Sequence, residues 1–353
     1  MTELAMPQVG VLPAGALGTI ADVSGVTVGH CTLADGPIQT GVTVVRAHPD
    51  DPYRHKVPAA ASVINGFGKS IGLVQVEELG VLETPIALTN TFGVATVAQA
   101  QIRAAIASNP QIGRKWPTVN PLVFECNDGY LNDIQALAVE DKHYVAALDA
   151  AASGFQRGSV GAGRGMSCFD LKGGIGSASR VANVAGKGFT VGALVLANFG
   201  RLPMLTIDGI PLGRELFARK QPASTAKPEQ GSIIMIVATD APLDSRQLKR
   251  LSMRAAAGLA RTGSVYGHGS GDIALAFSTA WTIPHEGDFI ATPPLLSDAR
   301  LDPLFHACAD SVEQAIIDAL WSATSVTGRD AHTRLSLREA ARDLEHLLKR
   351  HTT

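Results

Sequence analysis

One stretch of sequence organises this chain: Gln221-Pro-Ala-Ser-Thr-Ala-Lys-Pro-Glu-Gln-Gly-Ser-Ile-Ile-Met-Ile-Val-Ala-Thr-Asp240. Its first ten residues are mostly polar and include two prolines, which is typical of an exposed loop. The β-branched apolar run after Ser232 has the composition and length of a buried strand. Ser232 therefore lies where a reachable loop meets a rigid strand, a position that suits a nucleophile. Gly231 has no Cβ to shield its carbonyl carbon.

The same serine can cut its own chain. Attack of the Ser232 hydroxyl on the Gly231 carbonyl, followed by hydrolysis of the resulting ester, would separate residues 1–231 from residues 232–353. The new α-amine of Ser232 would titrate at roughly 7.7–8.0, so it can act as the base beside its own hydroxyl. A serine that opens a strand after a loop is also a common turn residue. This stretch alone leaves both interpretations open.

The composition is that of a soluble globular protein with a large core. Of 353 residues, 46% are apolar, and a net charge of −2 provides no basic face for nucleic acid or for a membrane surface. Cys31, Cys126, Cys168 and Cys308 are far apart and suggest no disulfide framework. The sequence shows no secretory signal and no apolar stretch of membrane-spanning length. We therefore expect a cytoplasmic protein that binds neither nucleic acid nor membranes.

Strand patterns and helix patterns are grouped along the chain instead of strictly alternating. The periodicity of apolar residues predicts strands near 20–30, 41–45, 59–64, 121–124, 175–184, 189–197, 233–239 and 273–277. It predicts helices over 94–107, 140–152, 245–261, 302–321 and 337–348. This grouping favours an α+β protein with layered antiparallel sheets over a doubly wound parallel sheet.

Three segments rich in glycine or polar residues invite a functional interpretation. Residues 65–70 end in Gly-Lys-Ser, but the P-loop motif requires a glycine where this chain has Val63, so we interpret the segment as a glycine turn. Residues 158–165 contain a G-x-G-x-G run without the βαβ unit of a dinucleotide site. Residues 125–133 follow a predicted strand, where a group of site residues and a solvated capping loop are both compatible with the sequence.

Several blocks of the chain resemble the DmpA-type aminopeptidases, the family of L-aminopeptidase D-esterase/amidases and β-peptidyl aminopeptidases. The blocks follow the family's order and cover most of the chain up to about residue 280: Asp22-Val-Ser-Gly-Val-Thr-Val-Gly-His30, Leu88-Thr-Asn-Thr91, Asn127-Asp-Gly-Tyr-Leu-Asn-Asp133, Gly161-Ala-Gly-Arg-Gly-Met166, Lys172-Gly-Gly-Ile-Gly176, Gly231-Ser-Ile-Ile-Met-Ile-Val-Ala-Thr-Asp-Ala-Pro-Leu243 and Gly269-Ser-Gly-Asp-Ile-Ala-Leu-Ala-Phe-Ser-Thr279. The resemblance implies a four-layer α/β/β/α sandwich like that of the N-terminal-nucleophile hydrolases. It also implies one domain that cuts itself into a large subunit, 1–231, and a small subunit, 232–353.

The resemblance assigns a role to each of seven residues. They are Ser232 as nucleophile, Asn198 as donor to the oxyanion, Ser270 and Asp272 as the groups that orient Ser232 and relay protons, Tyr130 beside the reacting carbonyl, and Glu125 and Asn127 at the substrate's amino group. A carboxylate suits a substrate ammonium, and a neutral amide suits a developing oxyanion. Three positions depart from the family pattern: His268 where asparagine is common, Cys126 where threonine is frequent, and Asp272 where some relatives have glutamate.

The expected activity is release of the N-terminal residue from small peptides, amides or esters. The sequence leaves open whether that residue is an L-α, D-α or β-amino acid. No H-E-x-x-H motif and no cysteine pair with ligand spacing is present, so we expect neither a metal nor another cofactor. The resemblance also implies an oligomer of processed heterodimers. Two alternatives stay open: an acyltransferase of the ornithine acetyltransferase type, where threonine stands at the cleavage site instead of serine, and a non-catalytic binding protein of the same fold.

Overall fold

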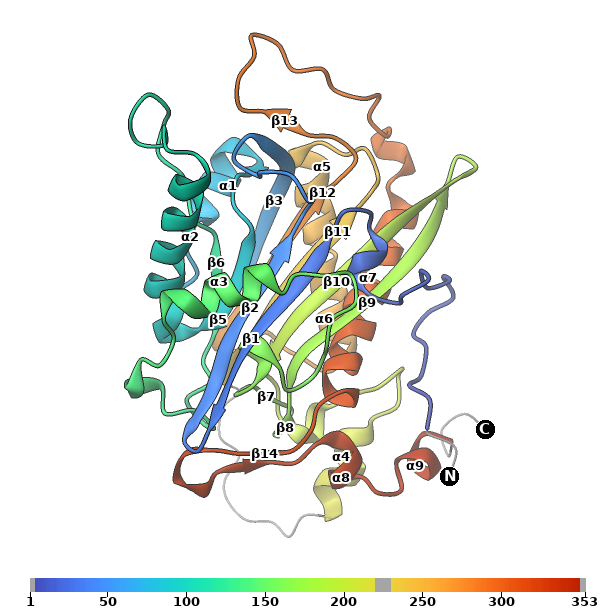
Figure 1. The fold of residues 1–353 in the computed structure, drawn as a ribbon. Helices are drawn as coiled ribbons and strands as arrows, with labels where there is room; N and C mark the ends of the chain where they lie inside the picture. The colour runs from blue at the N-terminus through green and yellow to red at the C-terminus, as the bar shows by residue number, and fades with distance from the viewer. Residues whose placement is uncertain (1–3, 220–229, 350–353) are drawn as a thin grey trace.

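Two β-sheets lie face to face at the centre of the molecule (Figure 1). The computed structural model describes residues 4–219 and 230–349. The smaller sheet has the strand order β1 (Thr27–Asp35), β2 (Ile38–Arg46), β5 (Ile86–Asn90) and β6 (Val123–Cys126). The larger has the order β13 (Ile283–Pro284), β3 (His55–Gly66), β12 (Gly269–Ser278), β11 (Gln230–Thr239), β10 (Lys187–Asn198) and β9 (Gly174–Val184), with β4 (Val81–Leu82) beside β3.

Both sheets are mixed, which refines the expectation of antiparallel sheets. Most neighbouring strands in them are antiparallel, but β5 pairs with β6, and β11 with β12, in parallel. A parallel pair needs a crossover connection. Helix α2 (Val94–Ser108) lies within the first crossover, and helices α5 (Ser245–Ser252) and α6 (Ala255–Arg261) lie within the second.

The alternation of side chains along β11 shows why the fold has four layers. Ile233, Met235 and Val237 pack in the core beneath the helices, whereas Ile234 and Ile236 pack in a second core with residues of the smaller sheet. Successive strand residues point to opposite faces, so an apolar run without polar interruption indicates a strand that is covered on both sides. The predicted four-layer α/β/β/α arrangement is therefore confirmed.

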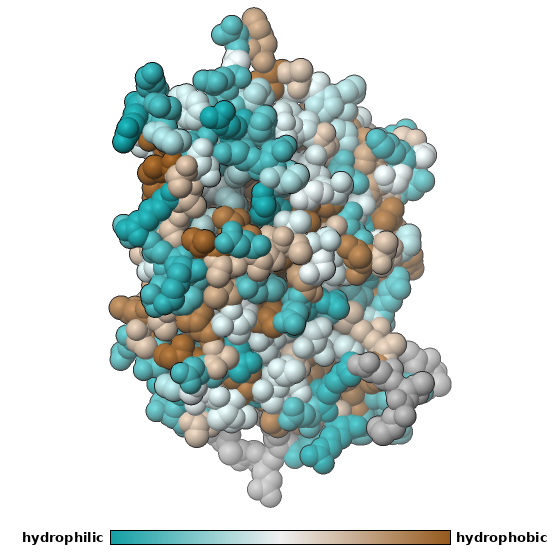
Figure 2. Space-filling model, in the orientation of Figure 1, coloured by the Kyte–Doolittle hydropathy of each residue, from teal (hydrophilic) through white to brown (hydrophobic). Residues whose placement is uncertain are grey.

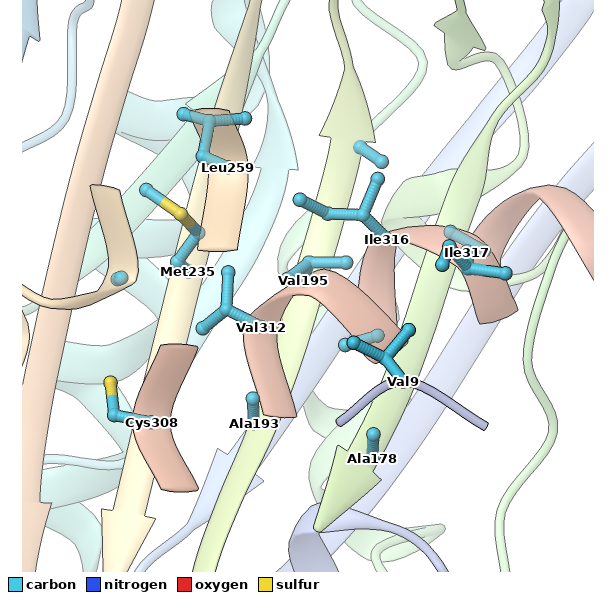
Figure 3. Close-up of a cluster of buried hydrophobic side chains, with 14 of the residues drawn as sticks. Val9, Ala178, Ala193, Val195, Met235, Leu259, Cys308, Val312, Ile316 and Ile317 are labelled. Carbon is cyan, nitrogen blue, oxygen red and sulfur yellow. The ribbon is translucent and has the colours of Figure 1, made fainter. Parts of the chain in front are cut away.

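Helices cover the outer face of each sheet. Helix α2 and helix α3 (Asp141–Asp149) contribute to a core with the smaller sheet, while α5, α6 and α7 (Asp302–Trp321) cover the larger one. Figure 3 shows Val312 and Ile316 of α7 above Val195 of β10, with Leu259 of α6 beside Met235. Helix α7 begins at Asp302 as predicted, with Pro303 in its first turn, but its N-cap is Leu301 and not Asp302.

Two predicted helices are interrupted in the structure. The segment 245–261 forms α5 and α6 with a break at Met253 and Arg254, and the C-terminal segment forms α8 (Leu337–Ala340) and α9 (Leu344–Lys349) with a break at Ala341. The predicted apolar stripe of the first pair is correct, since Leu248, Leu251, Ala255 and Leu259 are all buried. Burial of one face survives the breaks because each short helix keeps its own inward side chains.

The remaining elements are short. They are the helices α1 (Leu73–Leu79) and α4 (Leu212–Arg219), the paired strands β7 (Ser167–Cys168) and β8 (Leu171–Lys172), the paired strands β14 (Val326–Thr327) and β15 (Thr333–Arg334), and 3-10 turns at Ile20–Asp22, Thr91–Gly93, Ile134–Ala136, Gly161–Gly163, Leu202–Met204, Asp298–Arg300 and Arg329–Ala331. Figure 1 shows β7, β8 and β14 at one end of the molecule, below the larger sheet.

The visible surface carries no single dominant apolar face. On the side shown in Figure 2, hydrophobic residues form small groups among hydrophilic ones. No helix within the described residues 4–219 and 230–349 has the length and apolar character needed to cross a membrane. Residues 221–229 of the predicted loop 221–230 lie outside the described residues, and residue 230 already belongs to β11.

Candidate active site

Three neighbouring strands place Ser232 at the end of the larger sheet. In their register Asn198 of β10 lies opposite Ser232 of β11, which lies opposite Gly271 of β12. The Ser232 Oγ accepts a hydrogen bond from the Gly271 N–H at 3.1 Å. Ser232 is 5% exposed and lines a cavity of about 640 Å³. The serine is thus held by a strand and open to a space that can hold a small substrate.

The residue before Ser232 has to be glycine for a steric reason. Gly231 has a φ of +153°, and a Cβ at this position would lie 2.1 Å from the Asn198 carbonyl oxygen and 2.9 Å from the Cα of Phe199. A side chain would therefore push β11 away from β10. The bond between Gly231 and Ser232 lies near the start of β11, where both residues pair with β12 and pairing with β10 begins at Ser232.

The Asn198 side chain is fixed by two main-chain groups. Its Oδ1 accepts from the Ser167 N–H at 2.8 Å, and its Nδ2 donates to the Asn127 carbonyl at 3.0 Å. The acceptor bond to Ser167 determines which side of the amide is oxygen. One N–H of Nδ2 donates to the Asn127 carbonyl. The amide has a second N–H, which can donate to a ligand in the cavity that Asn198 lines.

Ser270 and Asp272 form a buried pair beside the nucleophile. The Ser270 hydroxyl donates to Asp272 Oδ1 at 2.5 Å, and both residues are at most 1% exposed. Ser270 lies opposite Gly231 in the register of β11 and β12. The pair therefore borders the Gly231–Ser232 bond, but neither residue lines the cavity, and the hydroxyl of Ser270 contacts Asp272.

Glu125 reaches the cavity from the smaller sheet. It is the last residue but one of β6 and is 3% exposed, with one oxygen accepting from the Lys69 N–H at 2.8 Å and the other from the Thr91 hydroxyl. Both donors are neutral, and within the part of the chain that the structure describes no ion pair involves Glu125. A carboxylate held in this way keeps its negative charge available to a cationic ligand.

Asn127 and Tyr130 complete the group of predicted residues that line the cavity. Asn127 is exposed, and its side-chain oxygen accepts from the Gly129 N–H at 2.9 Å. The Tyr130 ring is stacked on His332, with ring centroids 4.6 Å apart. The guanidinium carbon Cζ of Arg334 lies 3.9 Å from the centroid of the Tyr130 ring. Five of the seven predicted residues thus line one cavity, while Ser270 and Asp272 lie behind it.

The sequence analysis missed four charged residues of this cavity: Lys69, Asp170, Arg201 and Arg334. His268, noted there only as a departure from the family pattern, also lines it, as do Ser167 and Phe67. Lys69 follows Phe67 and Gly68 in the segment that we interpreted as a plain glycine turn. That interpretation was incomplete, because the turn supplies the N–H that holds Glu125. The one signal available in the sequence was a lysine placed directly after a predicted strand and its turn.

Asp128 follows Asn127 in the chain but does not itself line the cavity. It is fully buried, and loss of hydration raises its pKa from 3.8 to about 7, although hydrogen bonds from Thr40, Asn132 and Asn90 favour the charged form. Its Oδ1 accepts from Asn132 Nδ2 at 3.0 Å. Among the residues that the structure describes, no group of three or more His, Cys, Asp or Glu side chains is arranged to hold a metal ion.

Comparison with known proteins identifies the family. The sequence profile of Peptidase family S58 matches residues 18–334, which is most of the chain and includes every residue that lines the cavity. The chain belongs to peptidase family S58. Membership makes this S58 protein a hydrolase of the peptidase class.

Individual relatives match over nearly the whole length. The S58 chain is 38% identical over 361 aligned positions to the β-peptidyl aminopeptidase BapA of Sphingosinicella microcystinivorans, covering 96% of this chain and 89% of that protein. It superimposes with a TM-score of 0.93, at 46% identity, on the crystal structure of a protein from Pyrococcus horikoshii OT3, covering 98% of both chains.

A third relative confirms the predicted fold family. The L-aminopeptidase D-Ala-esterase/amidase of Ochrobactrum anthropi, described as a variant of the Ntn hydrolase fold, matches this S58 chain with a TM-score of 0.87 at 35% identity, over 97% of this chain and 98% of that one. The predicted resemblance to the DmpA-type aminopeptidases is therefore confirmed, and so is the expected Ntn-hydrolase-like sandwich.

Proposed function

We propose that this S58 peptidase is a self-processing serine aminopeptidase with Ser232 as its nucleophile. The observation that carries the proposal is the geometry of one cavity. A serine hydroxyl at a strand end, an oriented amide donor and a buried carboxylate without a cationic partner in the described structure all line it. The first suits acyl transfer, the second an oxyanion and the third a substrate ammonium. The names of the relatives, which include aminopeptidases, support the same assignment.

Maturation would begin with the bond inside β11. The Ser232 Oγ attacks the Gly231 carbonyl carbon, the C–N bond to Ser232 breaks, and the hydroxyl proton passes to the released nitrogen. Water then hydrolyses the ester and leaves the carboxylate of Gly231 and the α-amine of Ser232. The buried Ser270–Asp272 pair lies beside this bond, so it is positioned to take part in proton transfer.

Turnover would use the same serine in its processed form. The substrate's ammonium binds Glu125, and the Ser232 oxygen attacks the carbonyl of the first residue while its proton moves to the α-amine, which then protonates the leaving group. The Asn198 N–H stabilises the oxyanion, and water hydrolyses the acyl-enzyme. An α-amine with an ordinary pKa of roughly 7.7–8.0 is partly neutral near pH 7, so it can accept this proton.

The substrate is a small peptide, amide or ester with a free amino terminus. The cavity volume of about 640 Å³ fits a ligand of a few residues. The relatives are named for β-peptidyl and for L-aminopeptidase activity. Assays with p-nitroanilides of β-, L-α- and D-α-amino acids assign the acyl group for this chain. We further propose that processed heterodimers assemble into an oligomer in the cytoplasm.

The decisive experiment separates the purified protein under denaturing conditions. Native protein should give two fragments, and the smaller should begin Ser-Ile-Ile-Met. Ser232→Ala should give one intact and inactive chain, because one oxygen serves both reactions. Ser232→Cys, which keeps a nucleophile of similar size, should still produce fragments. Intact chain in fully active native protein would disprove self-processing, and full activity of Ser232→Ala would disprove the nucleophile.

A further inference from the structure

A fully buried lysine lies behind the proposed oxyanion donor. Lys172, the last residue of β8, is 0% exposed, and its Nζ donates to the carbonyl oxygens of Gly163, Met166 and Gly173, each at 2.9 Å. Lys172 is not among the residues that line the cavity. Burying a charged side chain costs free energy, so the place of this lysine in the core calls for an explanation.

The three acceptors indicate the protonation state of Lys172. An ammonium has three N–H donors, whereas a neutral amine has two and a lone pair, which would face one of the carbonyl oxygens. Burial lowers the pKa of Lys172 well below its ordinary value, because the charged form loses its hydration. The three carbonyl oxygens take the place of that water, and their arrangement around Nζ fits the charged form.

One of the three carbonyls connects the lysine to the active site. The Met166 carbonyl belongs to the same peptide unit as the Ser167 N–H, and this N–H donates to Asn198 Oδ1 at 2.8 Å. The ammonium, the peptide and the Asn198 amide therefore form a continuous series of hydrogen bonds. In each link the group nearer the lysine is the donor. The series ends at the second N–H of Asn198 Nδ2, which can donate into the cavity.

The glycine-rich run 158–165, which the sequence analysis excluded as a dinucleotide site, supports this arrangement. Its Gly163 supplies one of the carbonyls that bind Lys172. A Cβ on Gly163 would lie 2.5 Å from the Ile175 nitrogen, so only glycine allows the run to pack this closely. Ser167 and Lys172 are also direct partners in the pairing of β7 with β8. The lysine and the peptide that it binds are thus held in a fixed relation.

A charge at one end of such a series strengthens the donor at the other end. The ammonium draws electron density toward the Met166 oxygen, which makes the Ser167 N–H more positive and a better donor. The Asn198 amide is polarised by that N–H in the same way. In the proposed mechanism Asn198 donates to the oxyanion, so the effect of the buried charge reaches the atom on which negative charge develops.

We propose that Lys172 is a positioning residue that orients and polarises Asn198 through the peptide unit between Met166 and Ser167. This inference rests on the proposed function, in which Asn198 is the oxyanion donor, and extends it by placing a positive charge behind that donor. Lys172 itself does not contact the substrate. Its removal should therefore lower kcat on every substrate and leave KM nearly unchanged, because the bond that it strengthens forms mainly in the transition state.

The test is a double-mutant cycle of Lys172→Met and Asn198→Ala, with kcat and KM measured for processed enzyme on one amino-acid p-nitroanilide. Lys172→Met keeps a side chain of similar length but removes the charge and the donors. Alone it should lower kcat roughly tenfold, as expected for one hydrogen bond, with KM within about twofold of native. In Asn198→Ala it should lower kcat by less than about twofold, because the lysine acts through the missing amide. Equal losses in both backgrounds would show a merely structural role and overturn the proposal.

The matched control is Arg180→Met. Arg180 is also a buried cation, 2% exposed, and it donates to the carbonyls of Ser179 and Val9, but it does not line the cavity. Its loss should lower the Tm and leave the kcat of folded, processed enzyme unchanged. A fall in kcat as large as that of Lys172→Met would show that loss of any buried cation has this effect, which would overturn the proposal.

Lys172→Gln is made in parallel in case Lys172→Met folds poorly. It keeps N–H donors without the charge and should also lower kcat at nearly unchanged KM. A native kcat in either processed variant would overturn the proposal. If processed Asn198→Ala itself keeps a native kcat, the proposed function fails instead, because Asn198 is then not the oxyanion donor.

A measurement on the native enzyme tests the charge without any variant. In protein labelled with ¹⁵N at lysine Nζ, nuclear magnetic resonance at pH 7 should show an ammonium whose protons exchange slowly with water, as complete burial of Lys172 requires. This signal would support the charged state on which the proposal depends. Its absence would overturn the proposal, even if neither variant of Lys172 can be purified in a processed form.

Discussion

The cavity has a floor and a wall that are built in different ways. The floor contains Asn198 and Ser232, which the paired strands β10, β11 and β12 bring into line by their register. The wall around Arg334 consists of two short ribbons, β7–β8 and β14–β15, held by side-chain contacts and a strained turn. Main-chain pairing positions the floor, so we expect substitutions there to affect every substrate. Side chains position the wall, so we expect substitutions of the side chains that line it to affect the activity on some substrates more than on others.

The most severe test of this comparison is Gly231→Ala. A Cβ here would lie 2.1 Å from the Asn198 carbonyl oxygen, so the change should separate β10 from β11 and move Ser232 away from the Gly271 N–H. We expect an uncut, inactive and destabilised chain, measured by denaturing electrophoresis and thermal unfolding. Gly154→Ala is the control, because a Cβ at Gly154 meets nothing within 4 Å. Native processing in Gly231→Ala would show that strand register does not control the floor.

The next largest effect is expected for Asn198→Ala. Loss of an oxyanion donor weakens an interaction made mainly in the transition state, so kcat should fall roughly 10²–10³-fold with little change in KM. The fall should be similar for every substrate. Asn183→Ala provides the control. The Asn183 side chain also accepts from a main-chain N–H, that of Gly186, but it lies at the turn between β9 and β10, at the opposite end of β10 from Asn198. Only processed variants are informative, and an unchanged kcat in processed Asn198→Ala would refute the assigned role.

Glu125→Gln tests the role of the carboxylate that the smaller sheet contributes to the cavity. The amide can still accept from the Lys69 N–H but carries no charge for a substrate ammonium. We expect KM to rise roughly tenfold to hundredfold, and N-acetylated substrates should be poor for the native enzyme. Glu83→Gln is the matched control, since Glu83 is also buried and accepts from Asn120 but does not line this cavity. Equal cleavage of acetylated and free substrates by native enzyme would contradict the assignment.

The smallest expected effect concerns Asp128, a fully buried residue next to Asn127 of the cavity lining. Burial raises its pKa from 3.8 to about 7, so between about pH 4 and pH 7 the unfolded chain loses a proton that the folded chain keeps. The free energy of unfolding should therefore fall as pH rises through this window, by up to ~4 kcal/mol. Asp128→Asn removes this contribution.

Thermal unfolding between pH 4 and pH 8 measures the prediction for Asp128. The Tm of Asp128→Asn minus that of the native protein should increase with pH by a few degrees. Asp35→Asn removes an exposed carboxylate at the end of β1 and controls for the change in net charge. A difference that is constant with pH would show that Asp128 keeps its charge throughout.

The same division explains what the sequence could predict. The apolar runs after Ser232 and over 302–321 predicted β11 and α7, because the spacing of neighbouring apolar residues indicates which of them are buried. The junction between loop and strand also led to Ser232, whereas the roles of Asn198 and Glu125 followed from the resemblance to the family. The breaks at Met253 and at Ala341 were not predicted, because an apolar stripe with helical spacing continues through both.

The wall could not be predicted for a different reason. Asp170, Arg201 and Arg334 are far apart in the chain, and each alone resembles a solvated surface charge. Their contacts depend on a turn whose residues, Phe169 and Asp170, are unusual for its conformation. A local pattern located Ser232 and the family resemblance located Asn198, whereas the charged residues of the wall became visible only in three dimensions.

The position of the Gly231–Ser232 bond within β11 has a consequence for the timing of maturation. Both residues of the bond pair with β12 and Ser232 also pairs with β10, so main-chain pairing holds the bond in the sheet and keeps it from entering the cleft of another protease. In the proposed maturation, each molecule would therefore begin to cleave itself when it folds. The half-life of the precursor would not change on dilution, and the supply of active enzyme would follow synthesis after a fixed delay, without an activator or a threshold concentration.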